Sequence, residues 1–158
     1  MSDIDISKIT DCSLFQGLNE DEIKLLSTLF SEKKLASGKT VFVEQMPGES
    51  LYLIKSGRVK VSKLLAEGDE RTLVTLKPKE LFGVLAVLDG SPRSATARVE
   101  DDAVLLSIKK QDFEKFSEAS PKIAYKVIRN IIRDFTARIR DNDEEYREML
   151  MWSLNETS

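Results

Sequence analysis

The 158-residue sequence contains no histidine and only one cysteine, Cys12. Without histidine, the chain lacks the most common protein metal ligand, the usual general base and the usual sensor of pH near neutrality. A single cysteine cannot form an internal disulfide or hold an iron–sulfur cluster. We therefore expect no metal site, and the unpaired thiol favours a cytoplasmic location.

Long apolar runs and an excess of positive charge are also missing. No run reaches the roughly 18 residues needed to cross a bilayer, and the N-terminus lacks a signal-peptide pattern. The net charge is -3, which argues against nucleic acid as the main partner. No nucleophile stands at a recognisable spacing from a basic partner. We expect no membrane contact, no direct DNA binding and no enzymatic activity.

Glycines are spread evenly through the middle of the chain, at intervals of about ten residues. The segments between them alternate in polarity or are β-branched, which is typical of short strands joined by turns. A hairpin turn is expected at residues 67–69. This pattern predicts an antiparallel β-roll or barrel rather than βαβ units. The expected strands cover residues 40–43, 51–54, 58–64, 72–76, 95–99 and 103–108.

Helical patterns flank this region on both sides. Asn19 and Glu22 have the spacing of a capping box at the start of a helix. Ser120 followed by Pro121 is a second helix start signal. Three helices are therefore expected, over residues 19–31, over residues 111–118, and from residue 121 past residue 149.

The long C-terminal helix carries two stripes of side chains. One stripe recurs at alternating intervals of three and four residues, which is the heptad pattern of a coiled coil. We expect the other stripe to pack on the roll and the heptad seam to pair with a second copy of the chain. The alternative is that the helix folds back and the seam is ordinary core. The residues expected at the dimer contact are Ile128, Ile132, Phe135, Ile139, Asn142 and Tyr146.

Residues 81–97, LFGVLAVLDGSPRSATA, join a short apolar run to a turn and a lone cation. Gly83 allows the backbone to approach a ligand closely. N–H groups of a short helix after this glycine would favour negative charge. Arg93 offers a planar guanidinium that matches two phosphate oxygens. The segment therefore predicts an anion-binding site.

The same segment resembles the phosphate-binding cassette of cyclic nucleotide-binding domains in the catabolite activator protein family. That cassette reads roughly F-G-E-L-A, a spacer, then P-R-[SAT]-A-[TS], and residues 82–86 and 92–96 match it at every position except 84. Residues 49–59 resemble a second family signature. The resemblance implies an α+β, mainly β fold: an eight-stranded antiparallel β-roll of jelly-roll order with an N-terminal helix and a long C-terminal dimerisation helix. The roll with its flanking helices would cover residues 1–120, and the long helix would cover residues 121–158.

The resemblance also implies roles for individual residues. In the family the cassette arginine and its neighbours hold the cyclic phosphate, and the glutamate accepts a hydrogen bond from the ribose 2′-hydroxyl. Val84 replaces that glutamate, which leaves the hydroxyl unsatisfied at a cost on the order of 1–3 kcal/mol. Base-reading positions carried over from the family fall at Arg138 and Ile139, which do not match its usual hydroxyl residues. The expected ligand-binding residues are Gly83, Val84, Leu85, Ala86, Arg93, Ser94 and Arg138.

Two turn glycines of the family are also replaced, by Gln45-Met46 before Pro47 and by Lys79. Three functions stay open: weak or atypical binding of cyclic AMP or cyclic GMP, binding of another small phosphate-containing anion, and a degenerate ligand-free interaction unit. No cofactor is expected apart from such an effector. Family members that regulate transcription carry a helix-turn-helix domain after the long helix. This chain is either a module that signals to an unknown output protein or the sensor half of a transcription regulator.

Overall fold

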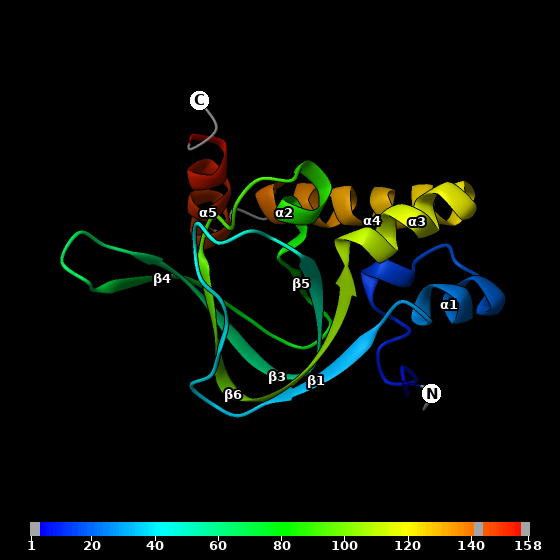
Figure 1. Cartoon of the computed structure of the whole chain (residues 1–158), viewed down its shortest axis with the longest axis horizontal. Coiled ribbons are helices and arrows are strands. Elements are labelled where there is room, and N and C mark those ends of the chain that lie inside the picture. The colour runs from blue at the N-terminus through cyan, green and yellow to red at the C-terminus, as the bar shows by residue number, and fades with distance from the viewer. Residues whose placement is uncertain (1–3, 141–143, 156–158) are drawn as a thin grey trace.

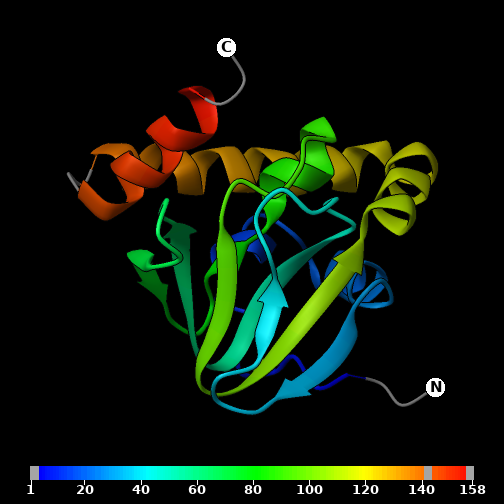
Figure 2. The same ribbon diagram turned by 60° about the vertical axis from the view of Figure 1, so that its left-hand side comes forward.

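The computed structural model describes residues 4–140 and 144–155, without the side chains of residues 138–140, 144–146, 149 and 155. A strongly bent antiparallel sheet forms a roll, and helix α4 (Pro121–Arg140) runs across one end of it (Figures 1 and 2). Helix α2 (Val84–Asp89) lies at the same end. Within the described residues, no helix is both long and apolar enough to cross a bilayer.

The sheet has six strands among the described residues, and every strand pairing is antiparallel. The order is β1-β6-β3-β4, with β2 paired to β6 and β5 paired to β3. The long strands β3 and β6 therefore form the centre on which the others assemble. The bounds are β1 Ser31–Leu35, β2 Thr40–Phe42, β3 Ser50–Leu64, β4 Glu70–Leu76, β5 Leu81–Phe82 and β6 Thr96–Lys109.

The expected count of eight strands is not confirmed. The segments predicted as 51–54 and 58–64 join into β3, and those predicted as 95–99 and 103–108 join into β6. The register of β3 against β6 shifts around Gly57, which has a φ of 85°. A Cβ atom at this position would lie 2.4 Å from the Asp102 carbonyl oxygen. Glycine therefore lets the strand bend sharply while it stays paired with β6.

Apolar side chains form two buried clusters. One fills the interior of the roll, and the other lies between the roll and the helices. Phe113 and Phe116 are buried in the second cluster, as their helical spacing predicts. The second stripe of the C-terminal helix, Ala124, Val127 and Ile131, is buried there as well. The prediction that this stripe packs on the domain is confirmed.

The capping box at the first α-helix is confirmed. The Asn19 side chain accepts from the Glu22 N–H at 2.8 Å, and the Glu22 carboxylate accepts from the Asn19 N–H at 3.1 Å. Helix α1 spans Glu20–Ser27 and is shorter than expected, because the chain enters strand β1 at Ser31. The 3-10 helix η1 (Ser13–Phe15) precedes it, and helix α3 (Lys110–Ala119) follows β6 directly.

The prediction of one continuous C-terminal helix is wrong. Helix α4 ends at Arg140, and a separate helix α5 (Glu144–Asn155) contacts both β4 and α4 (Figures 1 and 2). The Arg71 guanidinium of β4 pairs with the Glu148 carboxylate at 2.6 Å. The Trp152 ring centroid lies 4.7 Å from Lys63 Nζ. These contacts hold α5 on its own roll, so that α5 does not extend away from the domain.

The predicted dimer seam is divided between core and surface. Ile128 and Phe135 pack partly buried against the cluster between the roll and the helices. Tyr125 and Ile132 on the same helix are 63% and 57% exposed. Dimerisation through α4 stays a prediction. The side chains of three further predicted contacts, Ile139, Asn142 and Tyr146, lie outside the described residues.

Candidate functional site

The cassette connects strand β5 to helix α2 and returns to strand β6. Gly83 and Gly90, on either side of α2, adopt the left-handed φ values of 72° and 75°. A Cβ atom on Gly83 would lie 2.6 Å from Arg93 Nη1 and 3.3 Å from the Phe42 ring. Glycine is therefore required at position 83 both by the backbone conformation and by the close approach of the arginine.

The Arg93 side chain points inward and is only 4% exposed. Its Nη1 donates to the Gly83 carbonyl oxygen at 2.8 Å, and its Nη2 donates to the Ser50 carbonyl oxygen at 2.5 Å. The guanidinium carbon lies 4.1 Å from the centroid of the Phe42 ring, which is a cation–π distance. Arg93 thus joins the cassette to strand β3 and rests on an aromatic side chain from β2.

Arg93 makes no direct ion pair among the described residues, although the Glu49 carboxylate acts on its charge from a longer distance. Its buried Nε has no hydrogen-bond partner among those residues. Burial lowers the pKa of the Arg93 guanidinium. Arginine nevertheless remains protonated in proteins. The site therefore holds a buried cation and is electrostatically suited to an anion.

A cavity of about 440 Å³ borders this cation. The cassette residues that the sequence predicts come together on its wall, while the Arg138 side chain lies outside the described residues. The volume lies in the range of small-molecule sites, roughly 300–1,000 Å³. The cassette residues on the wall are Gly83, Val84, Leu85, Ala86, Arg93 and Ser94.

Sequence reasoning missed the walls of the cavity outside the cassette. They come from the roll interior, from α4 and from α5, which are distant in the sequence. Alternation of polarity identifies inward-facing strand residues, but it does not show which of them border a hollow. The heptad pattern assigns the α5 residues only to a coiled-coil helix. The missed residues include Phe42, Val61 and Leu76 from the roll, and Leu150, Ser153 and Leu154 from α5.

Val84 stands where the family pattern has its glutamate, and it is 3% exposed. It borders the cavity and also belongs to the apolar cluster between the roll and the helices. Its side chain has no hydrogen-bonding atom. The cavity wall at this position is therefore apolar.

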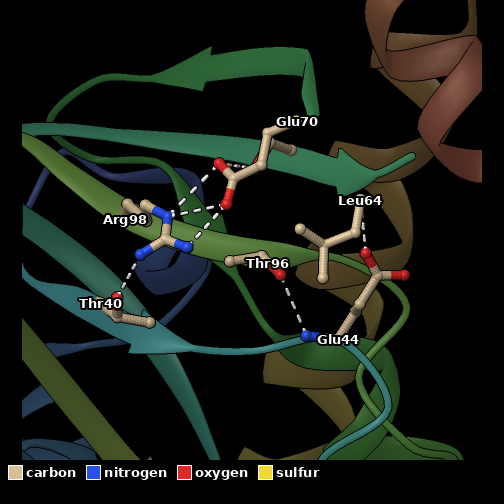
Figure 3. Close-up of polar contacts among 7 residues, drawn as sticks. Thr40, Glu44, Leu64, Glu70, Thr96 and Arg98 are labelled. Atoms are coloured by element: carbon tan, nitrogen blue, oxygen red, sulfur yellow. Dashed lines mark hydrogen bonds and ion pairs between the residues drawn. The ribbon is translucent and has the colours of Figure 1, made fainter. Parts of the chain in front are cut away.

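A buried ion pair between strand β3 and the segment after β2 contacts the cassette backbone at Ser94. Lys63 Nζ lies 3.1 Å from Glu44 Oε2, with both side chains at most 10% exposed. The same ammonium donates to the Ser94 carbonyl oxygen at 2.8 Å. Glu44 accepts from the Leu64 N–H at 2.6 Å, and its own N–H donates to Thr96 Oγ1 at 3.1 Å (Figure 3). These bonds position the backbone next to Arg93.

A second polar network ties three strands together beside the hydrogen bonds of Glu44 (Figure 3). The Arg98 guanidinium of β6 donates to Glu70 of β4 at 2.6 Å and to Thr40 Oγ1 of β2 at 2.6 Å. The hydrogen bond from Arg98 is the main reason that the pKa of Glu70 is lowered. The network links strands β2, β4 and β6 through the Arg98 side chain.

The two non-glycine turn residues that depart from the family pattern have left-handed backbones, with φ values of 71° at Gln45 and 76° at Lys79. The Gln45 N–H donates to the Arg93 carbonyl oxygen, and the Arg93 N–H donates to the Met46 carbonyl oxygen, both at 2.8 Å. The turn therefore keeps the conformation that glycine favours and holds the Arg93 backbone on both sides.

The comparison with known families agrees with this geometry. Residues 32–120 match the family model described as the cyclic nucleotide-binding domain. The chain belongs to the cyclic nucleotide-binding domain family. The resemblance seen in the cassette sequence is thereby confirmed, and the match includes the roll, the cassette and α3.

Known members of the family include bacterial regulators and kinase regulatory domains. A cyclic AMP receptor protein from Thermus thermophilus is 34% identical over 84% of this chain and 59% of its own length. The N-terminal domain of a transcriptional regulator from Streptomyces coelicolor superposes with a TM-score of 0.72, at 30% identity over 89% of this chain and 96% of that one. A protein kinase A regulatory domain from Toxoplasma gondii, solved with cyclic AMP, has a TM-score of 0.62, at 30% identity over 72% of this chain and 44% of that one. The chain spans 54–59% of the length of the first bacterial regulators it matches.

Proposed function

We propose that this domain is a regulatory receptor that binds a small anionic effector, a cyclic nucleotide or another phosphate-containing anion, at the cassette. The observation that carries the proposal is Arg93, a buried cation that makes no direct ion pair among the described residues and that borders a cavity. Binding of an anion there supplies a direct countercharge, which the more distant Glu49 carboxylate does not, in a site shielded from water. The relatives named as a cyclic AMP receptor protein and as a kinase regulatory domain solved with cyclic AMP support this assignment.

The cassette residues take separate roles in this proposal. Arg93 pairs with the anionic oxygens after exchanging one of its two carbonyl acceptors for the ligand. The backbone N–H groups in the first turn of α2, at Val84, Leu85 and Ala86, add partial positive charge. Ser94, which also borders the cavity, offers a hydroxyl donor. Val84 makes the receptor atypical, because a ribose 2′-hydroxyl finds no acceptor in its side chain.

The output passes through the C-terminal helices. Phe135 of α4 and Leu150 of α5 border the same cavity as the cassette, so an effector contacts both helices directly. Tyr125 and Ile132 give α4 an exposed apolar strip for pairing with a second copy. The effector thereby biases the arrangement of the helices, and a homodimer relays that arrangement to an output protein.

Isothermal titration calorimetry tests the proposal with cyclic AMP, cyclic GMP, cyclic di-GMP and inorganic phosphate. We expect heat of binding with at least one of these anions and its loss in Arg93→Ala. Because that variant also removes two internal hydrogen bonds, Arg93→Lys provides a second variant that keeps the charge but not the planar fork.

The matched control is Arg58→Ala, which removes an exposed arginine paired with Asp101 on the same roll. This variant should bind like the wild type. If none of the four anions binds and none raises the melting temperature, the domain is instead a ligand-free interaction unit. That second candidate draws support from the two carbonyl oxygens that already accept from Arg93.

A further inference from the structure

The cavity combines one buried cation with walls that are mainly apolar. Arg93 is the only cationic residue among the described residues that border it. The polar lining residues on the cassette side, Asp89, Ser91 and Ser94, lie in or next to the turn that follows α2. Asp89 is occupied by hydrogen bonds from the Ser91 N–H and hydroxyl. Apart from Gln45, the lining residues from the roll are apolar, and they include Phe42, Val61, Leu76, Phe82 and Ala95.

Helix α5 extends these apolar walls on the side of the helices. Leu150 and Leu154 border the cavity, together with Phe135 from α4, and Ser153 is the one polar α5 residue among the described residues that line it. The Arg71–Glu148 pair and the contact of Lys63 with Trp152 fix α5 to the roll at positions flanking Leu150. A ligand whose charged group reaches Arg93 therefore has its remaining atoms against aliphatic and aromatic side chains.

We infer that the effector is an amphipathic organic anion, with one phosphate group at Arg93 and an apolar body that lies against Val84 and Leu150 of α5. This inference rests on the proposed function and names the chemical class of its ligand. Hydroxyl groups held against Val84 and Leu150 would lose their hydrogen bonds to water without gaining partners from these two side chains. Apolar atoms would instead exclude water from the same surfaces. The site therefore selects against a sugar and for a hydrophobic group.

A pair of phosphate monoesters of equal charge tests the inference. 1-Naphthyl phosphate carries an apolar body, and ribose 5-phosphate carries a hydroxylated one, while inorganic phosphate measures the contribution of the charged group alone. We expect the wild-type chain to bind 1-naphthyl phosphate at least tenfold more tightly than ribose 5-phosphate. Equal binding of the two esters, or tighter binding of ribose 5-phosphate, overturns the inference while leaving the anion site intact.

Substitutions on α5 test whether Leu150 contacts the apolar body of the ligand. Leu150→Ser should weaken binding of 1-naphthyl phosphate about fivefold or more and leave inorganic phosphate unchanged. The matched control is Met151→Ser on the same helix, because Met151 is 55% exposed and does not border the cavity. Equal losses in the two variants contradict the role of Leu150. If all three phosphates fail while a cyclic nucleotide binds, this inference is overturned and the proposed function stands; if the cyclic nucleotides fail as well, the proposed function is overturned.

Discussion

Replacing Val84 with glutamate tests where the sugar side of the cassette lies. Val84 is 3% exposed and packs in the cluster that contains Leu81 and Val87. Without ligand, a glutamate there buries a carboxyl group in an apolar cluster, and mutational data put the cost of burying a polar group without a hydrogen bond at roughly 1–3 kcal/mol. We therefore expect Val84→Glu to be less stable than the wild type in the absence of effector.

The pH dependence of this loss has a definite sign. Burial in the apolar cluster raises the pKa of the introduced carboxyl above the value of about 4.3 that it has in the unfolded chain. We expect burial to outweigh the attraction of Arg93 on the same cavity wall, because that guanidinium already donates to two carbonyl oxygens. The unfolded state then releases its proton more readily than the folded state. The destabilisation of Val84→Glu relative to the wild type should therefore increase as the pH rises above about 4.3. Urea unfolding at pH 4 and pH 7 measures the difference.

Although Val84→Glu is expected to be less stable than the wild type, it should bind cyclic AMP more tightly. A 2′-hydroxyl that donates to a carboxylate is worth about 1.5–3 kcal/mol, or roughly ten- to over a hundredfold in affinity. Calorimetry should show this gain for cyclic AMP and not for 2′-deoxy cyclic AMP, which has no hydroxyl to donate. Val84→Ile, an apolar control, should not separate the two nucleotides. A folded Val84→Glu protein that binds cyclic AMP no more tightly than the wild type would refute the placement of the sugar.

Three further predictions concern the supporting structure. Lys79→Gly should be more stable than Lys79→Ala by about 1 kcal/mol in thermal unfolding. Both variants remove the exposed ion pair with Asp11, but only glycine adopts the left-handed backbone without strain. A more stable Lys79→Ala would show that the backbone at this position is not strained. Glu70→Gln should be less stable than the wild type above pH 4.5, and the difference should shrink as the pH falls. The reason is that hydrogen bonds from Arg98 lower the pKa of Glu70 in the folded state, so their contribution to stability is lost when Glu70 is protonated. An acid-unfolding profile like that of the wild type would count against this prediction. Sedimentation should find a wild-type dimer that Ile132→Glu dissociates, and a wild-type monomer would exclude pairing through α4.

Local patterns predicted much of the fold and the segment that forms the cassette. The capping box at Asn19 and Glu22 depends on bonds between residues three positions apart, so spacing alone identifies it. The cassette is likewise a contiguous segment, and its glycine, short helix and returning arginine are brought together by the turn at Gly90. Composition alone argues against histidine-dependent sites, because the chain has no histidine.

Other features depend on contacts between distant segments. Sequence spacing gives no indication that Arg93 donates to the Ser50 carbonyl oxygen on β3, because that contact requires the roll to be closed. The merging of two predicted strands into β3 depends on Gly57 bending within a ladder that β6 continues on both sides. Periodicity identifies which face of a strand is buried, and it carries no information about bends that preserve pairing.

The C-terminal region shows most clearly what the sequence determines and what only the tertiary structure decides. A heptad pattern in the sequence is sufficient to show that one face of a helix is apolar and must pack against another apolar surface. It cannot show whether the partner is a second chain or the roll of the same chain, because either surface can cover an apolar helix face. The tertiary structure places α5 on β4 through Arg71 and Glu148, and brings Leu150 to the cavity. The physical reason is that helix formation depends on neighbours within one or two turns, whereas docking depends on the surface that the rest of the chain presents.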